Sequence, residues 1–116
     1  MMNSEIQFGE ILWTDFDPSV GHEFQGRRPA LVIQSTAQIR KSNLVTIMPL
    51  TSQINSPIAE DILVRASSTN KLKTDSLLKV FDITSFDCTR FIKKIGELEA
   101  QSLIVVKAYL RVHFEL

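Results

Sequence analysis

Hydrophobic and polar residues alternate along the first three quarters of the chain, which is the pattern of β-strands. Val45 and Ile47 show this period of two, and Ile62 and Val64 repeat it. We expect five strands, over residues 11–16, 30–34, 44–50, 61–65 and 77–84. A short helical turn is predicted at 36–42 and polar loops at 53–59 and 66–75, while 88–94 is ambiguous.

The period changes from two to that of a helix near the C-terminus, over residues 97–114. This predicts an amphipathic helix of roughly 17 residues, about 25 Å long. Glu97 and Glu99 near its start suit the positive end of the helix dipole. Ile104 and Ala108 fall on its polar side, which suggests a second buried face and self-association. The expected inner face consists of Leu98, Val105, Val106, Tyr109, Leu110 and Val112.

These elements predict a mainly β fold with a C-terminal helix. Several short strands followed by one packing helix are typical of a small, strongly bent antiparallel sheet or a partly open barrel. The chain has 116 residues and contains no internal repeat, low-complexity segment or linker. We therefore expect a single domain over residues 1–116.

Composition restricts the kinds of partner. Thirteen basic and thirteen acidic residues cancel, which argues against a protein that coats DNA but allows a short single strand in a local basic groove. The basic residues fall into three clusters, which are Arg27, Arg28, Arg40 and Lys41, then Lys71, Lys73 and Lys79, then Arg90, Lys93 and Lys94. No apolar run approaches the ~18 residues of a membrane span and no signal pattern opens the chain, so we expect a cytoplasmic protein.

Candidate chemistry lies in three polar segments, namely 17–29, Thr51-Ser52 and Lys73-Thr74-Asp75. They contain neither a metal-ligand cluster nor a Gly-rich phosphate loop, and Cys88 is the only cysteine. We therefore expect no metal and no cofactor. Arginine is suited to holding a phosphate, because its planar fork donates to two oxygens at once. Composition alone does not select a reaction.

Two stretches carry a family resemblance. Gly9-Glu10-Ile11-Leu12-Trp13 precedes a loop with the order G-x-E-x-x-G-x-R-P, which here is Gly21-His22-Glu23-Phe24-Gln25-Gly26-Arg27-Arg28-Pro29. This order, continued through Pro49-Leu50-Thr51-Ser52, resembles the MazF/PemK/Kid family of toxin endoribonucleases. The resemblance extends from Gly9 to the final helix.

The resemblance implies both a fold and an activity. The fold would be an SH3-like (CcdB/PemK-type) antiparallel barrel with a packing helix. The activity would be sequence-specific, metal-independent cleavage of single-stranded RNA by its own 2′-hydroxyl, leaving a 2′,3′-cyclic phosphate and a 5′-hydroxyl. Such toxins are homodimers with the RNA groove between subunits, and a cognate antitoxin blocks that groove.

The same resemblance implies catalytic roles for four residues. Arg28 matches the arginine that stabilises the scissile phosphate, and Thr51 matches the threonine at the same site. His22 matches a histidine linked to transition-state stabilisation. Asp75, in Thr74-Asp75-Ser76, matches the aspartate proposed as general base.

Five further residues are expected to bind substrate. Ser52 stands beside Thr51 as in the Kid-like branch, and Glu23 matches an acidic position proposed as the base in other members. Lys73 replaces an arginine proposed as general acid; lysine donates a proton but lacks the fork. Phe24 replaces a usually polar residue and Arg27 adds a charge, so both are expected to affect which RNA fits.

Two other interpretations stay open. A related fold serves CcdB-type toxins, which bind DNA gyrase through a C-terminal tail containing Trp. Here the single Trp is Trp13, which we expect in the core, and the chain ends with His113-Phe114-Glu115-Leu116. A catalytically inactive binding module is the third interpretation, favoured by the lysine at position 73.

Overall fold

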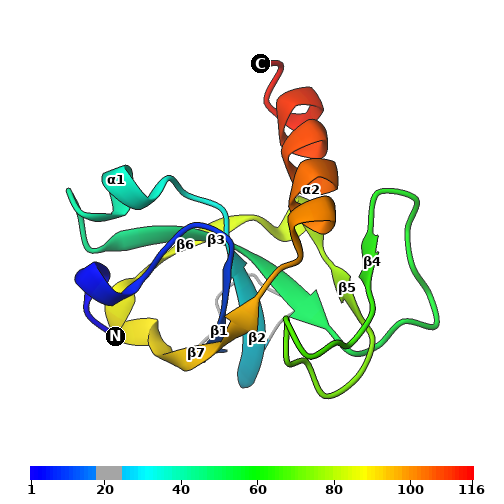
Figure 1. Ribbon diagram of the computed structural model, residues 1–116, viewed down its shortest axis with the longest axis horizontal. Coiled ribbons are helices and arrows are strands. Elements are labelled where there is room, and N and C mark those ends of the chain that lie inside the picture. Colours follow the sequence, from blue (N-terminus) through cyan, green and yellow to red (C-terminus); the bar gives the residue numbers. More distant parts are fainter. Residues whose placement is uncertain (18–24) are drawn as a thin grey trace.

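The computed structural model describes residues 1–17 and 25–116, which form a curved antiparallel sheet, short helical turns and one long C-terminal helix (Figure 1). The strands are β1 (Glu10–Asp15), β2 (Arg27–Val32), β3 (Leu44–Thr51), β4 (Ile62–Val64), β5 (Ser76–Leu78), β6 (Thr84–Asp87) and β7 (Phe91–Glu97). The helical elements are η1 (Asn3–Glu5), α1 (Thr36–Ile39), η2 (Val80–Asp82), η3 (Cys88–Arg90) and α2 (Ala100–His113). Within the described ranges, no helix is both long and apolar enough to cross a membrane.

Strand β3 organises the sheet, whose order is β4-β5-β3-β2-β1-β7. One edge of β3 pairs with β2, while its other edge pairs with β6 along the first half and β5 along the second. The predicted strand 77–84 is thus two strands, β5 and β6, which both run antiparallel to β3 and are separated by η2. The expected fold class is confirmed, although the described strands leave β4 and β7 as free ends and do not close a barrel.

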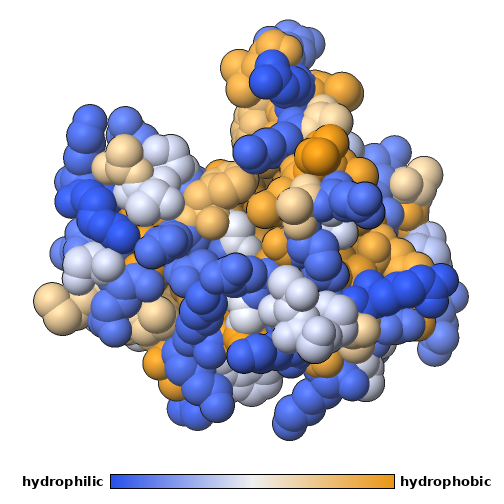
Figure 2. Space-filling view, viewed as in Figure 1, coloured by the Kyte–Doolittle hydropathy of each residue, from blue (hydrophilic) through white to orange (hydrophobic). Residues whose placement is uncertain are grey.

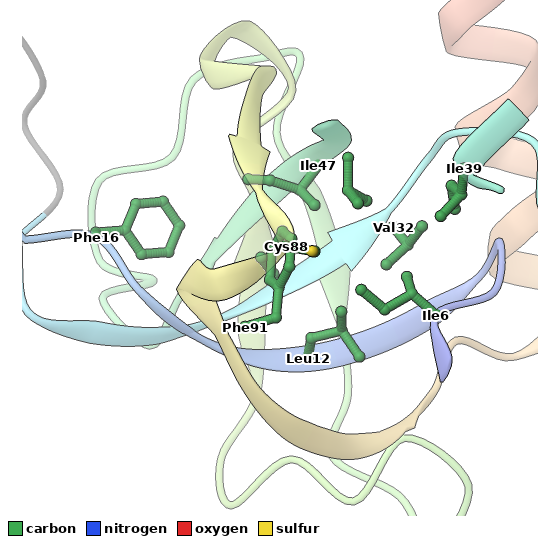
Figure 3. Close-up of a cluster of buried hydrophobic side chains, with 10 residues drawn as sticks. Ile6, Leu12, Phe16, Val32, Ile39, Ile47, Cys88 and Phe91 are labelled. Atoms are coloured by element: carbon green, nitrogen blue, oxygen red, sulfur yellow. The ribbon is translucent and has the colours of Figure 1, made fainter. Parts of the chain in front are cut away.

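Strands β1, β2 and β3 bury both of their faces. Neighbouring residues Ile11 and Leu12 point into different cores, because successive side chains of a strand alternate between its faces. The first core lies under α1 and η3 and is drawn in Figure 3, where Cys88 and Phe91 lie among the aliphatic side chains. The second core includes Leu31, Met48 and, from α2, Val106.

Helix α2 packs only part of its length on the second core and then projects from the body (Figure 1). Val106 is buried, and Leu103, Tyr109 and Leu110 pack partly against the core. The predicted inner face was wrong at Val105 and Val112, which are 51% and 76% exposed. The exposed apolar side chains of α2 contribute to the hydrophobic surface of the projecting part in Figure 2.

Most of the ambiguous segment 88–94 is part of a strand, and the C-terminal helix begins later than predicted. Phe91–Glu97 is strand β7, which pairs with β1, so Glu97 ends a strand and α2 begins at Ala100. Glu99 precedes the helix as its N-cap residue without a capping bond from its side chain. Instead its carboxylate binds Ser67 and Asn70.

Residues 66–75, which we call the Lys71 loop, are fixed against β7 and the start of α2. Glu97 N donates to Thr69 O at 3.2 Å, and the Asn70 side chain, which is fully buried, donates to Glu99. A Cβ on Gly96 would lie 2.3 Å from Asn70 O and 2.8 Å from Thr69 O. Only a glycine at position 96 therefore allows the backbone of this loop to approach so closely.

Gly96→Ala is expected to destabilise the protein by about 2 kcal/mol, because the methyl group would meet backbone atoms that have no room to move. Urea unfolding followed by circular dichroism measures this. Gly26→Ala is the control: Gly26 has a φ of +71° but open space around its Cβ. We expect a loss of about 1 kcal/mol there. Equal unfolding midpoints for Gly96→Ala and the wild type would contradict the close docking.

Candidate functional site

A groove of about 890 Å³ lies between the start of β2, the end of β3, the Lys71 loop and β7. Six cationic residues line it, namely Arg27, Arg28, Lys71, Lys73, Lys93 and Lys94. Among the described residues that line it there is no carboxylate. The zero net charge of the chain therefore conceals a strongly positive groove.

The register of the sheet brings two predicted segments together. Strand β2 pairs with β3 through Ala30↔Pro49, and the same register continued by two residues would place Arg28 opposite Thr51. Ser52, directly after Thr51, is exposed and lines the groove. Arg28 is half-buried, and its Nε donates to Gln25 O at 3.2 Å.

The ends of the connection between β1 and β2 are fixed by hydrogen bonds. Phe16 N donates to Gly26 O, and Gly26 N donates to the Asp17 carboxylate at 2.8 Å. Arg90 donates to the carbonyl oxygens of Asp15 and Asp17. These bonds set where the connection leaves β1 and where it enters β2, beside Arg27.

Thr51 and Asp75 do not line the groove. Thr51 is buried at the end of β3, where its hydroxyl accepts a hydrogen bond from Gln53 N. Asp75 belongs to the Lys71 loop; its carboxylate accepts from Ala66 N at 2.8 Å and lies 3.8 Å from Arg65. The predicted residues that the groove does bring together are Arg27, Arg28, Ser52 and Lys73. The predictions for His22, Glu23 and Phe24 concern residues outside the described ranges.

Sequence reasoning missed the contribution of Trp13. It was expected in the core, but it is half-buried and lines the groove. Its neighbours across the sheet are Pro29 on β2 and Lys93 on β7. An indole face beside cations is an arrangement that suits a flat, anionic ligand. Lys71 and Lys93 belong to the charge clusters in the sequence, but their convergence on one groove depends on the fold.

Lys94 differs from the other groove cations because two carboxylates bind it. Its ammonium lies 2.7 Å from Glu97 and 3.1 Å from Glu10, whose side chain is 8% exposed. The hydrogen bond to Glu97, followed by that to Glu10, raises the pKa of Lys94 above its ordinary 10.5. The hydrogen bond from Lys94 lowers the pKa of Glu97 below 4.5. Lys94 thus serves mainly to join β1 to β7.

Comparison with known proteins adds the decisive observation. Residues 7–114 match the family model described as PemK-like, MazF-like toxin of type II toxin–antitoxin system. The chain belongs to this family. Endoribonuclease MazF9 of Mycobacterium tuberculosis is 30% identical over 113 residues, which are 93% of this chain and 95% of that protein. Endoribonuclease EndoA of Bacillus subtilis is 26% identical and covers 96% of each chain.

The fold matches solved structures of the family as well. The crystal structure of MazF from Deinococcus radiodurans superposes with a TM-score of 0.80 at 26% identity, and it covers 96% of this chain and 97% of that one. The family and the endoribonuclease class predicted from the sequence are confirmed by these matches.

The described residues contain no group of three or more His, Cys, Asp and Glu that could hold a metal ion.

Lys94→Met is expected to lower the free energy of unfolding by about 1 kcal/mol, because it leaves the carboxylate of Glu10 without its cation. The added change Glu10→Gln should restore part of that loss, since the two effects are coupled. The stability that the ionised Glu97 carboxylate contributes is fully present above pH 4.5 and is lost as the pH falls through its lowered pKa. That of Lys94 is present below pH 10.5 and lost as the pH rises through its raised pKa.

Denaturant unfolding at several pH values measures this. The difference between wild type and Lys94→Met should be largest between pH 4.5 and 10.5 and should narrow in acid. A difference that does not change with pH, or additive effects of the two substitutions, would show that the ion pair contributes nothing.

Proposed function

We propose that residues 1–116 form a single toxin domain that cleaves single-stranded RNA at a short recognition sequence without a metal ion, acting in the cytoplasm. The observation that carries this proposal is the positive groove. It is lined by Arg27 and Arg28 at the start of β2, by Ser52 after β3 and by Lys73. Family membership supplies the endoribonuclease class. A groove with an indole and several cations suits the bases and phosphates of a single strand.

The proposed reaction needs no cofactor. The 2′-oxygen of the RNA attacks the adjacent phosphorus and the bond to the 5′-oxygen breaks, which leaves a 2′,3′-cyclic phosphate and a 5′-hydroxyl. A base takes the 2′ proton, and an acid protonates the leaving oxygen. Cationic donors stabilise the extra negative charge on the phosphate in the transition state.

Arg28 is the proposed phosphate ligand, because its guanidinium stays charged and donates two parallel hydrogen bonds. Ser52, which lines the groove, is proposed to contribute a hydroxyl donor to the same phosphate. Thr51, directly before it, is buried and would contribute its hydroxyl once the end of β3 opens toward the groove. Lys73 is the cation on the Lys71 loop that we propose as proton donor. Glu23 and Asp75 remain candidates for the proton-accepting role, and one oxygen of the Asp75 carboxylate accepts a hydrogen bond from Ala66 N. His22 is proposed to stabilise the transition state.

A homodimer and a cognate antitoxin are the proposed protein partners. The exposed apolar residues of α2, including Ile104, offer a surface for a second copy of the chain. Related solved structures include an endoribonuclease in complex with its cognate antitoxin from Mycobacterial species, and MazE-MazF from Deinococcus radiodurans. We propose that an antitoxin segment rich in carboxylates occupies the positive groove and excludes RNA.

Arg28→Ala is expected to reduce RNA cleavage about 10²–10³-fold, because a charged donor to the transition state is lost. The assay uses a long mixed-sequence RNA in EDTA and maps the ends of the products. Arg28→Lys keeps the charge without the fork and should retain an intermediate rate. A DNA strand of the same sequence should stay intact, since it lacks the attacking 2′-hydroxyl.

Discrete cuts that bear cyclic phosphates, and that disappear in Arg28→Ala, would support the proposal. Loss of wild-type cleavage in EDTA would exclude the metal-free mechanism. If folded wild-type protein leaves RNA intact under all conditions, the protein is a binding module rather than a nuclease.

Trp13 provides a direct test of where RNA binds, because it is the single tryptophan of the chain and lines the groove. We expect a saturable quenching of its fluorescence when a short RNA with 2′-O-methyl groups, which cannot be cleaved, enters the groove. The quenching should weaken as salt rises. RNA that binds by filter retention but leaves the Trp13 emission unchanged would place the ligand elsewhere.

A further inference from the structure

Lys71 has a backbone conformation that the rest of the molecule imposes on it. Its φ is +56°, a left-handed value that is unfavourable for residues other than glycine and uncommon for lysine. Such conformations persist where surrounding contacts fix them, and they gather at binding and catalytic sites. The Lys71 side chain lines the groove.

A closed set of hydrogen bonds holds this backbone in place. Lys71 N donates to Ser67 O at 2.9 Å, which closes one turn. The side-chain oxygen Oδ1 of Asn70 accepts from Ser67 N, which lies before Lys71, and from Leu72 N, which follows it, both at 3.0 Å. The backbone on both sides of Lys71 is thereby bonded to one buried side chain.

The same side chain connects the loop to the body of the protein. The Asn70 amide nitrogen donates to Arg65 O at 2.8 Å and to the Glu99 carboxylate at 2.9 Å. Asn70 is fully buried and lies over Gly96, where no larger residue fits. Leu72, the next residue after Lys71, is buried in the second core. Lys71 is therefore an exposed cation on a rigid support.

Within the part of the chain that the structure describes, no carboxylate lies within 4.0 Å of the Lys71 ammonium. Glu97 is close enough for Lys71 to contribute to its lowered pKa, but the hydrogen bond from Lys94 is the larger cause. Lys71 lines the groove, its backbone is held in an unfavourable conformation, and no close ion pair accounts for its position. These are the features of a lysine that binds an anion.

Lys71 and Arg28 reach the groove from different elements. Arg28 is on β2, and the Lys71 loop docks on β7 at Gly96, with β1 between these two strands. Two strand spacings separate β2 from β7, which is about 10 Å. Because different strands at this separation support the two cations, we assign them to different phosphates of one strand.

We propose that Lys71 binds a backbone phosphate of the RNA next to the scissile one, and that Asn70 and Glu99 are positioning residues for this contact. This inference rests on the proposed function of the groove. Lys71 contributes to the affinity for the strand and not to the chemical step. The subsite takes any nucleotide, because a lysine that contacts a phosphate reads no base.

Lys71→Gly is the most informative variant. Glycine adopts a φ of +56° without strain, so the fold should be as stable as the wild type or more so. Binding of the 2′-O-methyl RNA should weaken about fivefold, and the slope of log K against log salt should fall by about 0.7, the value for one contact to a single strand. Single-turnover cleavage at subsaturating protein should slow by the same factor by which the affinity falls. Lys71→Arg should retain both the affinity and the slope.

Glu99→Gln tests the positioning role, because it weakens the acceptor of Asn70 without changing the size of the side chain. It should lower the slope of log K against log salt as Lys71→Gly does. The double variant Lys71→Gly/Glu99→Gln should show no lower slope than Lys71→Gly alone. An equal further loss in the double variant would overturn the positioning role.

If the folded Lys71→Gly protein binds RNA with the affinity and the salt slope of the wild type, the proposed phosphate contact is overturned. Cleavage by the wild type would still support the proposed nuclease in that case. If the wild type binds RNA with a slope that depends on Lys71 but never cuts it, the nuclease fails and the subsite stands.

Discussion

Strands β1, β2 and β3 have no solvent face along most of their length, and the positions of the other elements follow from this constraint. Ile11, Leu31 and Met48 are neighbours across the sheet and enter one core, whereas Leu12 and Ala30, the pair beside Ile11 and Leu31, enter the other. A slip of one residue would exchange the two sets of side chains, so the register is strongly fixed. Because the register is fixed, the start of β2 and the end of β3 line the same groove, and Trp13 lies between Pro29 and Lys93.

The sequence predicted those strands that alternate regularly and failed where the alternation is interrupted. β1, β3 and β4 lie within a few residues of the expected ranges. β7 was left ambiguous because two irregularities shift its register against β1, and because Ile92 is exposed while Lys93 and Lys94 follow in succession. β5 and β6 were predicted as one strand since both extend along β3, and the three residues of η2 are too apolar to signal a break.

For the site, local motifs identified the residues that lie close in sequence, and long-range contacts determined the rest. Arg28, Ser52 and Lys73 were found because each belongs to a short recognisable segment, and they do line one groove. The position of Lys71 in the groove could not be predicted, since it depends on a loop folded over Gly96 and on a carboxylate 28 residues later, Glu99. Net charge was also uninformative, because carboxylates elsewhere balance the cations of the groove.

The concentration of cations in the groove links folding to ligand capture. Like charges held on one concave surface repel each other, and this repulsion is absent from the expanded unfolded chain. Two carboxylates lie close to Lys94, whereas no carboxylate of the described ranges lies within 4.0 Å of the ammonium groups of Lys71, Lys73 and Lys93. An anionic strand or an acidic protein segment relieves the repulsion, so it stabilises the native state beyond the contacts that it makes. Synthesis of such a chain without an anionic companion is therefore expected to yield the protein in its least stable form, and the same concentration of positive charge favours capture of an anionic ligand.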